Sequence, residues 1–588
     1  MSQRAGILLA TILGSAIVFL DSTVVNVALD TIGQELPTTF VGRFEGLTYV
    51  NSAYFAVLSA LLILAGALND FYGRRRMFRI GLIGFGAASV ICGIAPTMEI
   101  LIAARVLQAA FGAVLVPGSL SIITAAFSGE ERGRSIGLWA AGTSATSVIG
   151  PLIGGLLVQS ISWRAAFLIN IPLVLLALWA TRVVPESRDE RASGRFDWLG
   201  ATVIAVGVGG LAFGATRGQE REWQDLLAFV ALGVGAVATL LFPLLMLRRP
   251  RIVDGRIELA RPVNPLVPLS LFRSRNFSVV NVSTFVIYGA LYVSFVFQAL
   301  FFQGTLGYTP IAAGAVGIPV GLLLTFLSTP AGQLSARYGP RLFMTIGPII
   351  MAAGFLWFAR VPATSTPWLA DPGDLATFVP PVDTLIDILP ASIVFGIGLS
   401  LLVAPLTTAL MASVPVQNAG LGSAINNAIS RVGQPLIGAA LFIGITATFY
   451  PSLASRIPGI DVDSPEVREQ VQPLTSVPEE VDPELATAAQ EASTDAFHLA
   501  MLVSAGLCLA GAAVNGLGIR NPPPEKVEEQ GAQEAQEARV AGAACGSGRV
   551  PRRSSSRRSS SRRSSSSAGA GDLCAAREAL RKRLPSFR

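Results

Sequence analysis

Two ionisable residues, Asp21 and Arg105, lie inside long apolar stretches, where a charged side chain is expensive and points to function. If Gly6–Leu29 and Ile100–Phe127 are helices that cross a membrane in opposite directions, both side chains lie about 8–9 Å from the same boundary. Burial destabilises the ionised form of a carboxyl group, and a nearby guanidinium stabilises it. Equal depth does not by itself make the two residues neighbours, but it allows a pair whose carboxyl group gains and loses a proton. The alternatives are a static ion pair and an Asp exposed to water.

Apolar runs long enough to form such helices recur along the chain. A bilayer core of about 30 Å needs about 20 apolar residues in a helix. The 588 residues are 52% hydrophobic and only 14% charged, whereas about a quarter of the residues of soluble proteins are charged. A set of ordinary soluble domains is therefore excluded. The sequence predicts fourteen spans, namely Gly6–Leu29, Leu47–Leu68, Met77–Ala95, Ile100–Phe127, Ser135–Val158, Ala165–Val184, Trp198–Thr216, Leu226–Leu247, Ser278–Gln303, Ala312–Leu334, Leu342–Phe358, Ile388–Met411, Ser423–Phe449 and Ala496–Gly518.

Basic residues mark one side of the predicted membrane. Arg74, Arg75, Arg76 and Arg79 follow the second span, and more arginines follow the eighth and the tenth. The positive-inside rule makes this side cytoplasmic, so we expect a multi-pass plasma-membrane protein with both termini in the cytoplasm. The strongly acidic segment 450–495 is then an extracytoplasmic loop.

The end of the chain differs from the rest in composition. Residues 549–588 contain 12 Lys or Arg and 2 Asp or Glu, so without them the net charge is −4 instead of +6. Residues 521–588 offer few apolar residues to fold around and predict a disordered, Arg/Ser-rich cytoplasmic tail. Without a folded RNA-binding module beside it, the tail does not indicate a nucleic-acid partner.

The sequence lacks the residue patterns of metal sites, disulfide frameworks, ATP-binding loops and catalytic serines. The four cysteines have no metal-site or disulfide spacing, and His498 is the only histidine, so no metal is expected. No G-x-x-x-x-G-K-[ST] loop is present, and neither is a G-x-S-x-G elbow in a strand–turn–helix context. We therefore expect neither an enzyme nor a cofactor, and no process driven directly by ATP.

Polar side chains scattered through the spans are candidates for a binding cavity. Aromatic and amide groups without a rigid charge pattern suit varied amphipathic ligands. Arg431, near the start of Ser423–Phe449, is expected to orient that helix instead of binding a ligand. The candidate cavity residues are Asn26, Gln108, Tyr288, Tyr292, Gln298 and Asn426.

The loop after the second span carries a known signature. Its sequence, Gly66-Ala67-Leu68-Asn69-Asp70-Phe71-Tyr72-Gly73-Arg74-Arg75-Arg76, resembles the major facilitator superfamily motif G-x-L-x-D-x-x-G-R-[KR]-[KR]. A weaker copy, which lacks the Asp, runs from Gly332 to Arg341 after the tenth span. Two copies at equivalent helix ends are what a duplicated six-helix half predicts.

Further motifs resemble those of the fourteen-helix drug:proton antiporters of this superfamily. Leu20 to Leu29 matches L-D-x-T-[IV]-V-N-V-A-L, and Trp163 to Pro172 matches W-R-x-x-F-x-x-N-x-P. Arg105 and Gln108 match R-x-x-Q-G-x-G without its glycines. Gly137, Gly150, Pro151, Gly154 and Gly155 resemble the antiporter motif of exporters, although Thr146 replaces its middle glycine.

The resemblance implies an all-α polytopic membrane protein with the major facilitator fold, in which two six-helix bundles flank two extra helices. The implied parts are an N-terminal half (1–185), a linker with the extra pair (186–262), a C-terminal half (263–520) and the tail. In this fold the first and fourth spans are neighbours, which brings Asp21 and Arg105 together. Gly66, Asp70, Gly73, Arg74 and Arg75 would form a conformational latch, although the arginines could serve topology alone.

The function implied is multidrug efflux by a proton-coupled antiporter, a monomer that exports small amphipathic or cationic compounds across the lipid bilayer and confers antibiotic resistance. An exporter of one metabolite or self-made antibiotic on the same fold is an alternative. A non-transporting membrane sensor is a second alternative. Asp21, Arg105 and the Gly150-Pro151 element argue against a sensor, which has no need of a buried proton site.

Overall fold

The computed structural model describes residues 2–39, 43–188, 196–220, 223–247, 249–253, 256–260, 265–371, 373–475, 477 and 481–521. Almost all of these residues are helical, as expected for an all-α membrane protein. The predicted tail, 521–588, lies outside the described residues apart from Asn521.

The long helices follow the predicted spans, and several extend beyond them. The described α-helices, long and short, are α1 (Gln3–Glu35), α2 (Arg43–Tyr72), α3 (Arg74–Gly93), α4 (Met98–Ala126), α5 (Gly129–Ser160), α6 (Ala165–Leu168), α7 (Asn170–Ala180), α8 (Trp198–Glu220), α9 (Leu226–Leu247), α10 (Arg275–Leu300), α11 (Pro310–Ala315), α12 (Ile318–Tyr338), α13 (Pro340–Phe358), α14 (Leu389–Ala412), α15 (Ala419–Arg456), α16 (Pro465–Gln470) and α17 (Pro483–Gly518).

Thirteen candidate membrane spans occur among the described residues, by length and hydropathy. The helix α5, with 32 residues, is not one of the thirteen, although it packs among the others. A multi-pass membrane protein is therefore confirmed, whereas the number fourteen stays a prediction.

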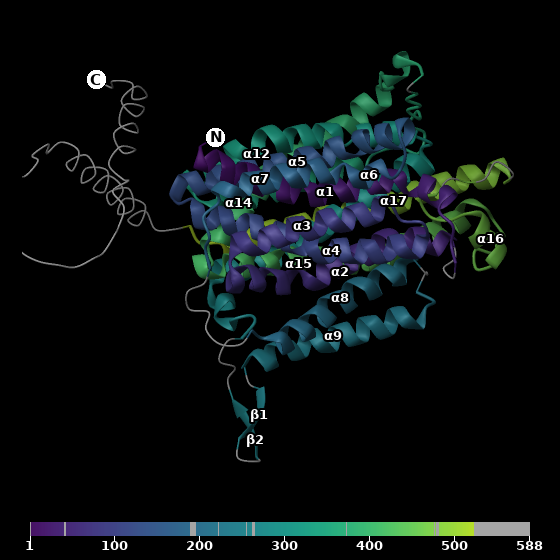
Figure 1. Ribbon diagram of the computed structural model, residues 1–588. Coiled ribbons are helices and arrows are strands. Elements are labelled where there is room, and N and C mark those ends of the chain that lie inside the picture. The colour runs from purple at the N-terminus through teal and green to yellow at the C-terminus, as the bar shows by residue number, and fades with distance from the viewer. Residues whose placement is uncertain are drawn as a thin grey trace, which may run out of the picture. The chain divides into compact units, whose positions relative to one another are not determined.

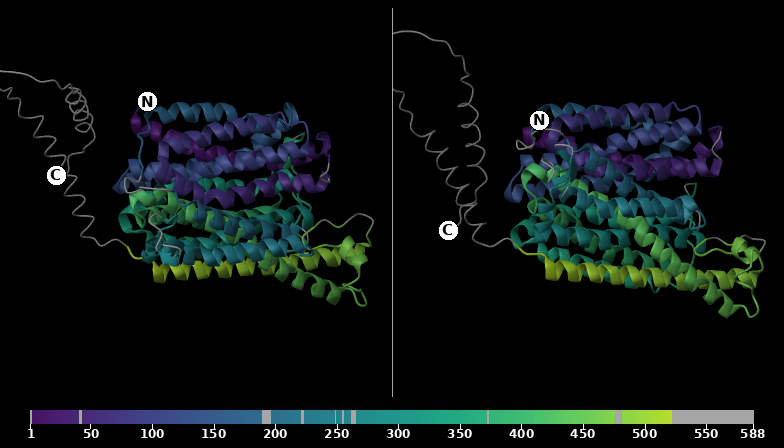
Figure 2. Two further views of the ribbon diagram at one scale, coloured as in Figure 1. Left: turned by 60° about the horizontal axis from the view of Figure 1, so that its bottom comes forward. Right: turned by 90° about the horizontal axis from the view of Figure 1, so that it is seen from below.

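The helices run side by side in two groups (Figures 1 and 2). In the first group α1 packs against α4, α5 and α7, and in the second α17 packs against α10, α13 and α15. The pairs α2 with α15 and α5 with α12 join the groups. The extra pair, α8 and α9, lies along one edge, where α8 contacts α2 and α15.

The two ends of the helix bundle differ in charge. We call the end where α2 gives way to α3, at Gly73, the arginine-rich end, because Arg74, Arg75, Arg76 and Arg79 follow that residue. Near it, after α9, the chain forms a hairpin of β1 (Arg249–Val253) and β2 (Arg256–Ala260), with Ile252 opposite Ile257. The sequence pattern did not predict these strands.

The opposite end, which carries α16, holds the acidic segment 450–495. Helix α15 continues to Arg456 and α17 already begins at Pro483, so the non-helical part of this segment is shorter than its sequence suggested. Ion pairs from Arg456 to Glu491 and Asp495, both at 2.8 Å, join the two helices.

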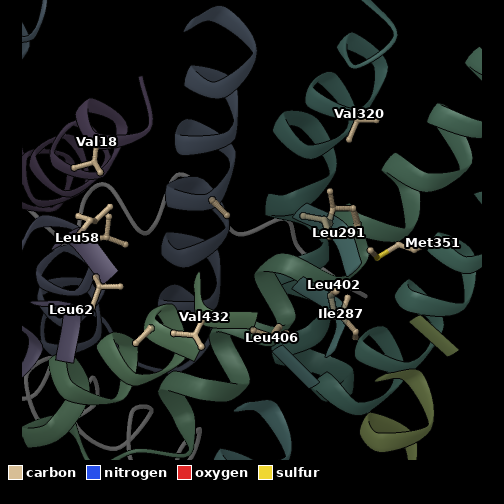
Figure 3. Packing of buried hydrophobic residues seen from close by; sticks show 14 of the residues in the cluster. Val18, Leu58, Leu62, Ile287, Leu291, Val320, Met351, Leu402, Leu406 and Val432 are labelled. Atoms are coloured by element: carbon tan, nitrogen blue, oxygen red, sulfur yellow. The ribbon is translucent and has the colours of Figure 1, made fainter. Parts of the chain in front are cut away.

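The apolar core continues from one group of helices into the other. Figure 3 shows Val18 and Leu58 on one side, Leu291 and Val320 on the other, and Val432 between them. Because lipid is as apolar as these side chains, close van der Waals packing stabilises the bundle more than hydrophobic burial does. Small residues at the helix contacts make this packing possible.

Gly66 shows how tight the contact between α2 and α15 is. A Cβ atom at this position would overlap that of Ala424 and lie 2.6 Å from the carbonyl oxygen of Gly420. We expect Gly66→Ala to lower the melting temperature of the detergent-solubilised protein, because overpacking typically costs about 1–3 kcal/mol. The control is Gly233→Ala on α9, where the added Cβ meets nothing within 4 Å. Equal melting temperatures for the two variants would contradict the prediction.

Candidate functional site

Asp21 on α1 and Arg105 on α4 form an ion pair inside the first group of helices. Nη1 of Arg105 lies 2.5 Å from Oδ2 of Asp21, and both side chains are 0% exposed. The pairing that the family resemblance implied, through neighbouring first and fourth spans, is therefore present. A water-exposed Asp21 is ruled out by this burial.

Two amides complete the coordination of the carboxylate. Its other oxygen, Oδ1, accepts hydrogen bonds from Nε2 of Gln108 at 2.9 Å and from Nδ2 of Asn170 at 2.8 Å. Both amides also donate to the hydroxyl of Ser89, at 2.8 and 3.3 Å respectively. Three donors on two oxygens match the acceptor-only, ionised form of Asp21.

Aromatic rings and a backbone carbonyl group enclose the guanidinium of Arg105. The guanidinium carbon lies 3.9 Å from the centroid of the Tyr54 ring and 5.8 Å from that of Phe167. Nε donates to the carbonyl oxygen of Val50 at 3.2 Å. Nη2 of Arg105 and the hydroxyl of Tyr54 are buried without a hydrogen-bond partner in the described part of the chain. Buried polar atoms are normally paired, so these two can receive an internal water or a new partner.

Residues of five helices, α1, α2, α3, α4 and α7, are hydrogen-bonded in this network. The local sequence explains the positions of those on α4 and α7. Arg105 and Gln108 are three residues apart on α4 and therefore share one face, where Nη1 donates to the Gln108 amide oxygen at 2.7 Å. Asn170 is the first residue of α7, directly after the break that separates α6 from α7. Sequence motifs included Asn170 without assigning it a role, and nothing singled out Ser89 or Tyr54.

A second site joins the two groups of helices at the arginine-rich end. The carboxylate of Asp70, near the end of α2, accepts hydrogen bonds from the backbone N–H groups of Gly420 and Leu421, at 3.2 and 2.9 Å. These groups belong to the first turn of α15, where the helix dipole favours an anion. Arg74 bonds to Asp70 at 2.9 Å and also donates to the carbonyl oxygen of Val416. Asp70 thus caps a helix of the other group, as its position in the loop motif suggested.

The turn at Gly73 is held by a residue that sequence reasoning missed. Gly73 has a φ of 105°, which a residue with a Cβ rarely adopts. The carboxylate of Glu186 accepts from the backbone N–H groups of Arg75 and Arg76, at 3.0 and 3.1 Å. It therefore caps the start of α3. Arg75 enters this arrangement through its backbone, because its side chain makes no ion pair with any residue that the structure describes.

The glycines of the predicted antiporter motif lie at two helix contacts of α5. A Cβ at Gly137 would lie 2.8 Å from the Cα atom of Thr329 on α12, in the other group. Gly150 and Gly154 face α1, where a Cβ would meet Thr23 or lie 3.1 Å from the Cα atom of Val24. The surroundings of Pro151 and Gly155 are outside the described part of the structure.

A cavity of about 390 Å³ lies between the two groups of helices. Its walls include Phe19 of α1, Trp139 of α5 and Tyr288 of α10. Asn426 of α15 also lines it, and its amide donates to Asn281 at 3.2 Å and to Thr284 at 2.8 Å. None of the described lining residues is charged.

The other candidate cavity residues lie elsewhere. Gln108 belongs to the Asp21 network. Gln298 lines a smaller cavity of about 80 Å³, which shares Phe295, Gly317 and Val320 with the larger one. The side chains of Asn26 and Tyr292 are outside the described part of the structure.

Comparisons with known proteins agree with this architecture. The profile of the Major Facilitator Superfamily matches residues 11–438. The chain is 31% identical over 457 residues to the multidrug resistance protein Stp of Mycobacterium tuberculosis, covering 77% of this chain and 78% of that protein. It is 26% identical over 536 residues to the tetracenomycin C resistance and export protein of Streptomyces glaucescens, covering 89% and 93%.

Solved structures show the same fold at low sequence identity. The human organic anion transporter MFSD10 superposes with a TM-score of 0.52 at 13% identity, covering 88% of this chain and all of that one. The proton:xylose symporter XylE superposes with a TM-score of 0.50 at 15% identity, covering 86% and 94%.

Proposed function

Since the chain belongs to the Major Facilitator Superfamily, and is thus a multi-pass membrane transporter and not an enzyme, we propose that it exports small amphipathic compounds in exchange for protons. Its curated relatives include multidrug and antibiotic resistance proteins, which supports drugs, dyes and antibiotics as cargo. We further propose the plasma membrane as its location, with the arginine-rich end and both termini in the cytoplasm.

The observation that carries the proposal is the position of Asp21. Its carboxylate is fully buried in the first group of helices, away from the cavity, yet Phe19 on the same helix lines the cavity. Protonation of Asp21 would remove its charge and release the donors from Arg105, Gln108 and Asn170. Because those donors lie on α4 and α7, α1 would then be free to move against them and change the wall of the cavity.

The two contacts between the groups suggest which side is closed. Asp70 with α15, and Gly137 with α12, both lie toward the arginine-rich end of their helices. On the proposed orientation, the cytoplasmic side is shut and the cargo leaves toward the opposite end. We also propose that a monomer is sufficient for transport.

Transport by the purified chain in proteoliposomes tests this function. With an acidic lumen, we expect accumulation of 8-anilinonaphthalene-1-sulfonate or ethidium above the level of protein-free liposomes. A protonophore should abolish this accumulation, because it removes the gradient. Movement of neither dye, or movement that survives the protonophore unchanged, would contradict proton-coupled export.

A further inference from the structure

Arg431 lies deep in the bundle, not near a helix end as its place in the sequence suggested. Helix α15 begins at Ala419, so Arg431 is twelve residues from its start, or about 18 Å at 1.5 Å per residue. The first turn of α15 is level with Asp70 at the arginine-rich end. Arg431 is therefore near the middle of a bilayer core of about 30 Å.

No described residue forms an ion pair with Arg431. It is partly buried, and its guanidinium carbon lies 6.0 Å from the centroid of the Phe55 ring on α2, across the contact between the two groups of helices. None of the ion pairs in the described part of the chain includes it. A charged residue at this depth normally faces a partner or a water-filled path.

The central cavity is next to Arg431. Asn427 lines the cavity and lies one helical turn before Arg431, so the two side chains share a face of α15. Moving along α15 from Asn427 to Arg431 leads away from the arginine-rich end. Arg431 is thus level with the cavity, because the cavity lining reaches Phe295 and Gly317, which lie nearer the opposite end of the bundle.

The charged side chains near the cavity, Asp21, Arg105 and Arg431, do not neutralise one another completely. Its described lining residues are uncharged. Asp21 is 0% exposed and already bound by Arg105, Gln108 and Asn170, so it cannot serve as the counterion of a ligand in the cavity. The guanidinium of Arg105 is in turn neutralised by Asp21. Among the described residues, the charge beside the cavity that has no counterion is therefore positive.

We propose that Arg431 is an anion-binding site beside the cavity, which selects amphipathic compounds that carry a carboxylate, sulfonate or phosphate group. The apolar part of such a compound fits the aromatic and aliphatic walls of the cavity, and its acidic group reaches the guanidinium one turn away. A guanidinium offers several donors in a planar fork, which suits these oxyanions. Lipophilic cations find no free carboxylate among the described lining residues. This proposal rests on the exporter function and narrows its cargo to anions.

A matched pair of dyes tests the site directly. 8-Anilinonaphthalene-1-sulfonate and N-phenyl-1-naphthylamine differ only in the sulfonate group. Their binding to the full-length chain in lipid nanodiscs is measured by fluorescence, with empty nanodiscs subtracted. We expect Arg431→Gln to weaken binding of the sulfonate about tenfold, which is about 1.4 kcal/mol, and to change binding of the neutral dye less than about twofold. Arg431→Lys should retain most of the affinity for the sulfonate, because it keeps the charge.

The control is Arg360→Gln at the opposite end, an exposed arginine that stacks on Trp357, with 5.0 Å from its guanidinium carbon to the ring centroid. It should leave the binding of both dyes unchanged. Equal weakening of both dyes by Arg431→Gln, no change with either, or tighter binding of ethidium than of the sulfonate by the wild type would overturn the proposal. Sulfonate binding that depends on Arg431 without gradient-driven transport would instead contradict the exporter function and leave the anion site intact.

Discussion

Asp21→Asn is expected to reduce gradient-driven dye accumulation to the level of protein-free liposomes. The amide has nearly the same shape as the carboxyl group but cannot gain or lose a proton at any physiological pH. Exchange of dye across the membrane at equal pH should persist, because the cavity itself is unchanged. The measurement compares accumulation under a pH gradient with exchange in its absence, using the same proteoliposomes.

Stability is a separate concern for this variant. Breaking a buried ion pair on one side typically costs about 3–5 kcal/mol, because Arg105 would be left without its counterion. Asp21→Glu provides a second variant that keeps a titratable group, and it should retain part of the gradient-driven transport. The control is Asp383→Asn, at the residue that precedes the short π-helix Thr384–Ile388, where hydrogen bonds from the backbone N–H and hydroxyl of Thr366 lower the pKa of Asp383. Dye accumulation by Asp21→Asn at the wild-type level would contradict a role of Asp21 in coupling.

Asp70→Ala is expected to open the arginine-rich end and slow transport at least about tenfold. The substitution removes the acceptor of the Gly420 and Leu421 N–H groups and the partner of Arg74. Hydrogen bonds to a charged group contribute about 1.5–3 kcal/mol each. Their loss is large enough to shift an equilibrium between two conformations by more than about tenfold.

A cysteine at a buried position reports this opening. Ser335 on α12 is only 2% exposed at the arginine-rich end. In a background with Cys545→Ser and Cys574→Ser, we expect Ser335→Cys to react slowly with a membrane-impermeant maleimide and much faster when combined with Asp70→Ala. Glu131→Ala is the matched control, because this acidic residue pairs with Arg4 at the surface instead of with α15. Unchanged labelling in the Asp70→Ala protein would show that the contact does not hold this end closed.

The sequence, together with the family resemblance, pointed to the ion pair and singled out Asp70. Asp21 and Arg105 are charged residues in apolar surroundings, and Asp70 lies in a motif loop. Few other residue types could form the same ion pair or the same hydrogen bonds at these positions. Depth along two helices predicted that Asp21 and Arg105 lie at the same level, and the family resemblance supplied their lateral contact. The membrane-spanning helices were also predictable, because a bilayer requires long apolar runs.

The remaining parts of the sites depend on tertiary contacts that apolar patterns do not reveal. Ser89 and Asn170 look like ordinary polar residues of a helix, and only the convergence of α3 and α7 on Asp21 makes them hydrogen-bond donors or acceptors there. Glu186 caps α3 from a segment more than a hundred residues away along the chain. Arg431 was misplaced because the apolar run begins after the actual start of α15.

Proton movement driven by the dye itself tests the role of Asp21 most directly. Proteoliposomes are loaded with a transported dye at the same pH on both sides, and the pH of the lumen is followed as the dye leaves. If Asp21 couples the two movements, dye efflux through the wild type acidifies the lumen, whereas Asp21→Asn exchanges dye without a change in pH. The same acidification in both proteins, or dye efflux through the wild type with no proton entering, would contradict the account.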